Sequence, residues 1–245
     1  MKKNNFFLFV SSILLLCASC CFKKDSIPTP LPPSTTTSSS SPSIIAKTLT
    51  LQPDAVSGKD AAIWYIQDQT TSHGATNTQN FGSYTEFPSI EWTFSGSPGR
   101  LQSLIQFDLS SIPASATITN VQLILYDCAG CIDDNLGETG GLMGNSNTAL
   151  IQRITSTWLE NTVTWNTQPS VTTQNQVSVP SNTSFPIQTT TVDVTSLVQD
   201  MVANPTSSFG FLFSQQVSSP YRSMLFASSD HSNAALHPKL VVQYE

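Results

Sequence analysis

From Lys47 onward, the sequence repeats short apolar runs separated by turn residues, and this pattern restricts the possible folds more than any other feature. In three runs, apolar residues recur at every second position, which buries one face of a strand and leaves the other at the surface. These sets are Val121, Leu123 and Leu125; Phe209, Phe211 and Phe213; and Leu240, Val242 and Tyr244. Short strands with turns between them predict an antiparallel sandwich or barrel. The expected strands are residues 48–52, 61–67, 89–94, 101–109, 121–127, 149–154, 162–165, 191–194, 209–214, 224–228 and 239–244.

One helix is expected between the strands, over residues 194–203. Its apolar residues fall at helical spacing and form a single stripe, which comprises Val194, Leu197, Val198, Met201 and Val202. Asp193 or Thr195 can cap its start. The helix must end before Asn204, because a residue that precedes a proline disfavours the helical conformation.

The N-terminus resembles a bacterial lipoprotein signal. Lys2 and Lys3 precede an apolar run, residues 6–16, that is too short to span a bilayer. Ala18 and Ser19 then fill the two small positions before Cys20, so residues 1–19 are expected to be removed and Cys20 to carry the lipid. Ordinary secretion of a soluble product is the alternative. Residues 20–46 are rich in Pro, Ser and Thr and predict a disordered tether, and residues 47–245 form the folded domain.

Two tryptophans, Trp158 and Trp165, lie in the stretch from Arg153 to Pro169, with Glu160 between them. Each ring can bury on the order of 200 Å². They could therefore nucleate a core or form a stacking platform for a ligand.

A series of motifs, in a fixed order, resembles the family named for the letters DNRLRE, some of whose members are similar to carbohydrate-binding module family 96. The series comprises Lys59–Ala61, Asn80–Gly82, Leu104–Pro113, Arg153–Pro169, Val192–Val198, Ser228–His231 and Pro238–Val242. The resemblance implies a single jelly-roll-type β-sandwich, carried on a secreted protein, that binds polysaccharide; the ligand known for family 96 is alginate. It also favours Trp158 and Trp165 as core rings, with Glu160 accepting an N–H hydrogen bond.

The net charge of −6 provides no basic surface for a nucleic acid, so none is expected as a partner. No serine lies in a Gly-x-Ser-x-Gly motif, and catalysis is not expected. Two enzyme-like features remain open: His231 beside Asp230, and carboxylate pairs such as Glu86 with Glu91 or Asp108 with Glu160.

Sugar recognition needs aromatic rings for stacking and polar side chains for hydroxyl groups. The candidate ligand-binding rings are Trp64, Tyr65, Tyr84, Trp92 and Tyr221, and the candidate donors are Lys59, Arg100 and Arg222. For each ring, packing in the core is the alternative.

The segment that follows residue 126 contains two further candidates. Cys128 and Cys131 predict a local disulfide in an oxidising compartment. Asp127, Asp133, Asp134 and Glu138 offer the oxygen ligands that suit a structural Ca²⁺, although they do not match an EF-hand loop. No other cofactor is expected.

Together these observations predict a non-enzymatic, monomeric lipoprotein, exported to the bacterial cell envelope and held at a membrane by its N-terminal lipid. Its β-sandwich is expected to bind polysaccharide. A structural or adhesion module without a glycan pocket is the first alternative, and a polysaccharide-degrading enzyme with an unrecognised site is the second.

Overall fold

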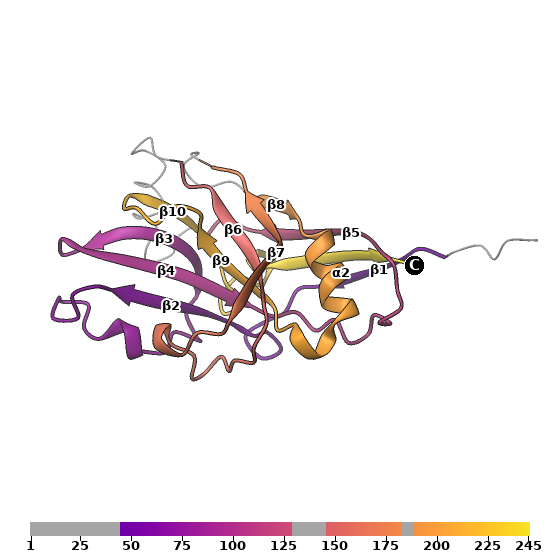
Figure 1. Ribbon diagram of the computed structural model, residues 1–245, viewed down its shortest axis with the longest axis horizontal. Helices are drawn as coiled ribbons and strands as arrows, with labels where there is room; N and C mark the ends of the chain where they lie inside the picture. Colours follow the sequence, from indigo (N-terminus) through magenta and orange to yellow (C-terminus); the bar gives the residue numbers. More distant parts are fainter. Residues whose placement is uncertain (1–44, 129–145, 183–188) are drawn as a thin grey trace, which may run out of the picture. The chain divides into compact units, whose positions relative to one another are not determined.

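The computed structural model describes residues 45–128, 146–182 and 189–245, which form two antiparallel β-sheets that pack as a sandwich (Figure 1). The small sheet has the strand order β1-β11-β5-β8. Its strands are β1 (Lys47–Leu51), β5 (Ile118–Leu125), β8 (Thr190–Asp193) and β11 (Lys239–Tyr244).

The large sheet has the order β10-β3-β4-β9-β6-β7, and β2 also pairs with β4. Its strands are β2 (Asp60–Ile66), β3 (Glu86–Phe94), β4 (Ser97–Ile105), β6 (Ala149–Ile154), β7 (Val171–Val179), β9 (Phe211–Gln215) and β10 (Arg222–Ala227). From β4 to β11 the chain crosses repeatedly between the sheets, so that β1-β11-β5-β8 faces β4-β9-β6-β7. This is the strand order of a jelly roll, and the expected all-β sandwich is confirmed.

The main core lies between the sheets and explains the alternating pattern. Val121, Leu123 and Leu125 of β5 are all buried in it, as are Leu240 and Val242 of β11. Phe211 and Phe213 of β9 join them, and Phe213 stacks on Phe87 with ring centroids 5.7 Å apart. Phe209 does not follow this pattern. It precedes Gly210, whose φ of +104° lies in the region that favours glycine, and it packs instead against a second core on the outer face.

Several predicted strands differ from the structure in their bounds, and three departures have a clear reason in the sequence. Residues 162–165 form no strand; they lead into a 3₁₀ turn, Trp165–Thr167. β4 begins at residue 97 rather than 101. Ser95 and Gly96, both with positive φ, form a two-residue hairpin turn, so β4 starts directly after β3 ends. β7 was not predicted at all, because residues 172–176 and Ser178 are all polar, so apolar residues do not alternate along most of the strand.

β7 forms one edge of the large sheet and is irregular. Asn175 has a φ of +56°, and the register with β6 shifts between Ile151 and Arg153. Most of its side chains are exposed. The strand therefore covers the edge of β6 while presenting a polar and interrupted outer edge of its own.

The predicted helix is confirmed as α2 (Thr195–Ala203), which buries Leu197, Val198, Met201 and Val202. Val194 occupies the N-cap position, but the capping carboxylate comes from Asp193, whose Oδ1 accepts hydrogen bonds from the backbone N–H (2.9 Å) and the hydroxyl of Thr195. Both bonds lower the pKa of Asp193, and the bond from the Thr195 hydroxyl has the larger effect. None of the residues described forms a helix with the length and hydropathy needed to cross a membrane.

Candidate functional site

The structure brings three of the eight predicted ligand-binding residues together on one face of the large sheet. Arg100 in β4 pairs with Tyr65 in β2 on one side and with Glu91 in β3 on the other. Glu91 in turn pairs with Arg222 in β10. Since paired residues on neighbouring strands project from the same face, these side chains form a row across four strands. We call Tyr65, Arg100, Glu91 and Arg222 the polar row.

The polar row is held by ionic and hydrogen-bonding contacts. The Arg100 guanidinium forms an ion pair with Glu91 through Nε, and its Nη2 donates to the hydroxyl of Ser218. Arg222 Nη1 donates to the carbonyl oxygens of Ser219 (2.8 Å) and Pro220 (3.2 Å). Glu91 is 7% exposed, and burial raises its pKa while Arg100 opposes that shift. Arg100 is therefore held by Glu91 of β3 and by Ser218, and Arg222 is held by the turn that precedes β10.

Trp165 extends the polar row, although the sequence had placed it with the core. Its ring lies 5.2 Å from that of Tyr65, and the guanidinium carbon of Arg100 lies 5.8 Å from the indole centroid. A capping box between Thr164 and Thr167 fixes the turn that carries it. Trp165 is only partly buried and packs against the second core. By contrast, Trp158 is fully part of that core, as predicted.

Three other candidates, Trp64, Tyr84 and Trp92, lie on the opposite side of the sheet. Each of their rings packs against another aromatic ring. Trp64 stacks on Phe81 with centroids 4.6 Å apart, and Tyr84 meets its edge at 5.5 Å. Trp92 contacts Tyr221 edge to face at 5.1 Å. Trp64 and Trp92 also pack against a small core of Ile66, Ile90, Phe94 and Leu101. For Trp64, Tyr84 and Trp92, a role in ligand binding stays a prediction.

Tyr221 lies in the turn that precedes β10, and its ring packs against Trp92, on the face opposite the polar row. The residue is 38% exposed, and its φ of +68° is an uncommon conformation for a bulky residue. Such strain persists only where the surroundings fix the backbone. Here the neighbouring Arg222 does so through its two hydrogen bonds to the same turn.

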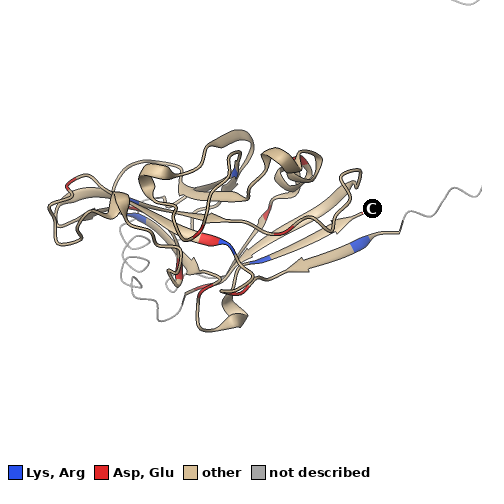
Figure 2. Cartoon of the chain, turned by 90° about the horizontal axis from the view of Figure 1, so that it is seen from below, with Lys and Arg blue, Asp and Glu red and all other residues tan. Residues whose placement is uncertain are grey.

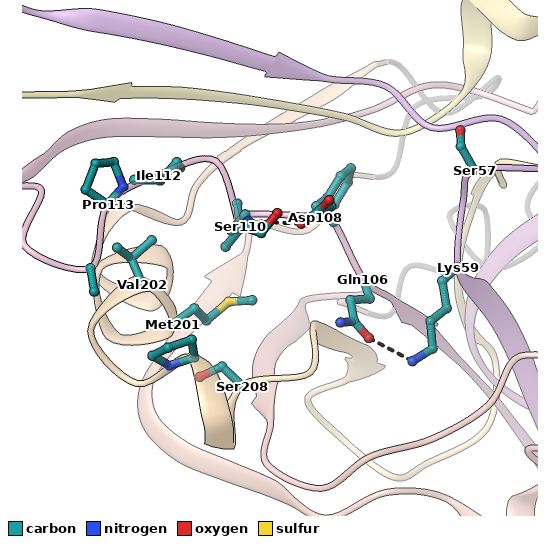
Figure 3. A pocket seen from close by; sticks show the side chains of 14 residues that line it. Ser57, Lys59, Gln106, Asp108, Ser110, Ile112, Pro113, Met201, Val202 and Ser208 are labelled. Carbon is teal, nitrogen blue, oxygen red and sulfur yellow. Dashed lines mark hydrogen bonds between the residues drawn. The ribbon is translucent and has the colours of Figure 1, made fainter.

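Lys59 lies elsewhere, at a pocket of about 650 Å³ between α2 and residues 106–114 (Figure 3). Its Nζ donates to Oε1 of Gln106 (2.8 Å) and lies 4.4 Å from the ring centroid of Trp158. Burial lowers the pKa of Lys59, and Glu160 opposes this shift. Met201, Val202 and Ile112 form the apolar wall. The one aromatic residue in the lining, Phe107, is buried, so the pocket offers no open ring for stacking a sugar.

A cluster of three carboxylates beside Lys59 was not predicted. Ligand oxygens of Asp60, Glu160 and Asp230 all lie within 4.8 Å of one another. Asp60 is 1% exposed; it accepts a hydrogen bond from the backbone N–H of Ser229 (2.7 Å) and donates its own N–H to Glu160 (3.0 Å). Burial raises the pKa of Asp60 to about 7, and burial is also the main cause of the raised pKa of Glu160 and Asp230.

The predicted N–H acceptor role of Glu160 is confirmed by its bond from Asp60. The loop that carries Glu160 is fixed by the Asn80–Gly82 motif: Asn80 Nδ2 donates to the carbonyl oxygens of Glu160 and Val163, each at 2.7 Å. Gly82 allows the close approach, because a Cβ at this position would clash with the Glu160 carbonyl. The sequence held a signal for the cluster, since each acid lies in a separate motif of the resemblance.

Two residues of the enzyme-like pairs, His231 and Asp108, accept hydrogen bonds from backbone N–H groups close to them in the sequence. His231 Nδ1 accepts from the backbone N–H of Asn233 (3.1 Å), and the carbonyl of His231 lies 2.7 Å from Nε2 of His237. Asp108 accepts from the backbone N–H of Ser110 (2.9 Å).

Figure 2 shows that charged residues are sparse over the domain, with both signs interspersed.

Residues 129–145 lie outside the described residues. This segment includes Cys131, Asp133, Asp134 and Glu138, so the disulfide and the calcium loop stay predictions. Of their partners, Cys128 is buried with its Sγ 4.0 Å from the carbonyl oxygen of Thr85, and Asp127 bridges to Phe226 of β10.

The described strands can now be compared with known families. The sequence model of carbohydrate-binding module family 96 matches residues 60–244, from the first residue of β2 to the last of β11. The chain belongs to carbohydrate-binding module family 96. The family 96 match includes the polar row, Trp165 and the three carboxylates, while β1 precedes it. No curated protein matches the chain.

Proposed function

We propose that this family 96 domain binds polysaccharide without catalysis, and that it does so with the polar row and Trp165. The observation that carries the proposal is the mutual contact of Tyr65, Trp165 and Arg100, which come from three separate parts of the chain. Two rings and a guanidinium at one place combine the stacking and hydrogen-bonding groups that sugar recognition needs.

The shape of the patch favours a chain over a single sugar. The polar row crosses the four strands β2, β4, β3 and β10, so successive residues of a polymer can contact its exposed members in turn. The two arginines can donate hydrogen bonds to hydroxyl groups while the buried Glu91 holds Arg100 in place, and Trp165 can stack on a sugar ring. The pocket at Lys59 lacks an open ring, and for this reason we assign the ligand to the sheet face.

Binding is tested by isothermal titration of the purified protein against a panel of neutral and acidic polysaccharides. We expect saturable heat with at least one of them. Arg100→Ala is expected to weaken that affinity about 10- to 100-fold, because hydrogen bonds to a charged group contribute about 1.5–3 kcal/mol.

Lys239→Ala is the matched control, because Lys239 also lies over a ring, that of Tyr126, at 5.4 Å, but on the small sheet. It should leave the affinity unchanged. An equal loss in both variants would contradict the assignment to the sheet face. No heat with any polysaccharide would instead favour the structural or adhesion module. Melting temperatures of both variants check that they remain folded.

We also propose that the domain is displayed from a membrane of the cell envelope by lipid on Cys20. The support is the order of charged, apolar and small residues before this cysteine. Metabolic labelling with a palmitate analogue should mark the wild-type protein, and Cys20→Ala should abolish the label. A Cys20→Ala protein that still carries the label would contradict this site.

A further inference from the structure

We infer that Asp60, Glu160 and Asp230 form a binding site for a divalent cation, and that their chemistry suits Ca²⁺. None of its three residues belongs to the polar row or to the calcium loop predicted from Asp127, Asp133, Asp134 and Glu138. It brings together the start of β2, the loop after β6 and the segment after β10, which are far apart in the sequence.

The spacing of the three oxygens fits one calcium ion. Ca²⁺ binds oxygen ligands at about 2.3–2.6 Å, so two ligands on opposite sides of the ion are about 4.6–5.2 Å apart. The three carboxylates have ligand oxygens no more than 4.8 Å apart. All three oxygens can therefore contact a single ion without a large movement of the backbone.

A second observation points to a ligand at the same place. The hydroxyl of Ser229 is buried without a hydrogen-bond partner, and the residue is 1% exposed. The Ser229 side chain lies beside the Asp60 carboxyl group, whose Oδ2 accepts a hydrogen bond from the Ser229 backbone N–H. Oδ2 of Asp230 is likewise buried without a partner. A buried polar atom left unpaired is costly, and a cation bound between these oxygens would satisfy both.

The charge of the cluster is only partly compensated. Over residues 45–128, 146–182 and 189–245, none of the three carboxylates forms an ion pair with Lys or Arg. Lys59 and His237 interact electrostatically with Glu160 and Asp230, respectively, but the Nζ of Lys59 is bonded to Gln106 and Nε2 of His237 lies 2.7 Å from the carbonyl oxygen of His231. Without a cation, three negative charges this close together repel one another. A bound Ca²⁺ would remove this repulsion.

The consequence of binding is a link between three loops. Glu160 lies in the same loop as Trp165, so a cation here would fix that loop to the start of β2. Stability is the direct readout, and it does not depend on the proposed polysaccharide ligand.

The test is a titration of CaCl₂ into protein that has been treated with a chelator and dialysed. Isothermal titration is expected to show one ion bound per chain, and the melting temperature should rise by several degrees as the site fills. NaCl at matched ionic strength should not reproduce the rise. Absence of both heat and a thermal shift with Ca²⁺ would overturn the inference.

Two variants locate the site. Asp230→Asn changes a partly exposed residue and should abolish the Ca²⁺-dependent rise, while its melting temperature in chelator stays equal to or above that of the wild type, because one repelling charge is gone. Asp108→Asn removes an exposed carboxylate outside the cluster and should keep the full response. A Ca²⁺ response retained in Asp230→Asn would place the ion elsewhere and overturn the assignment.

Discussion

Replacing Trp158 by alanine is expected to lower the free energy of unfolding by about 3–5 kcal/mol, the typical cost of removing a buried tryptophan. Trp158 is 5% exposed and packs with Ile154, Val163 and Leu212 in the second core. Its indole N–H also donates to the carbonyl oxygen of Phe209 at 2.9 Å. The substitution would remove the ring that joins the 155–170 loop to the outer face of the large sheet. Urea unfolding monitored by circular dichroism measures the change.

Two further variants separate the contributions of this ring. Trp158→Phe keeps most of the apolar volume but leaves the Phe209 carbonyl without its donor, so its cost should be smaller, about 1–3 kcal/mol. Trp165→Ala should cost less than Trp158→Ala, because Trp165 is only partly buried. An equal loss for both alanine variants would contradict the division between a core ring and a surface ring.

Gly82→Ala is expected to destabilise the domain by about 2–3 kcal/mol, although it adds a single methyl group. The added Cβ would clash with the Glu160 carbonyl oxygen and lie 2.8 Å from its carbonyl carbon. Since both groups belong to backbone, neither can move away without disturbing the two bonds from Asn80. Thermal or urea unfolding measures the effect.

Ser83→Ala is the control for this substitution, because Ser83 is the exposed neighbour of Gly82. A surface change of this kind should stay within about 0.5 kcal/mol. If Gly82→Ala were as mild as Ser83→Ala, the close packing of the Asn80–Gly82 motif against the Glu160 loop would be refuted.

The sequence predicted the strands whose two faces differ in polarity. β5 and β11 alternate, because one face of each lies in the main core, and α2 could be placed from its apolar stripe. β7 could not be found in this way, because most of its side chains are polar and its strand conformation depends on pairing with β6. The start of β4 was hidden by Pro98 and Gly99, which resemble a turn but pair with β3.

The candidate site was predicted as a set of residue types rather than as an arrangement. Tyr65, Arg100 and Arg222 were chosen for their chemistry, but only strand register shows that they share a face. Trp165 was assigned to the core together with Trp158, because both lie in one of the ordered motifs of the family resemblance. The carboxylate cluster was missed because Asp60, Glu160 and Asp230 are brought together by long-range contacts that no local pattern encodes.

The irregular outer edge of β7 has a consequence for how neighbouring molecules meet. A regular edge strand offers a row of free N–H and C=O groups on which another chain can build a continuous sheet. In β7, the left-handed Asn175 interrupts that row, and the polar side chains around it remain hydrated. We therefore expect many copies to be able to crowd together without templating fibrils along this edge.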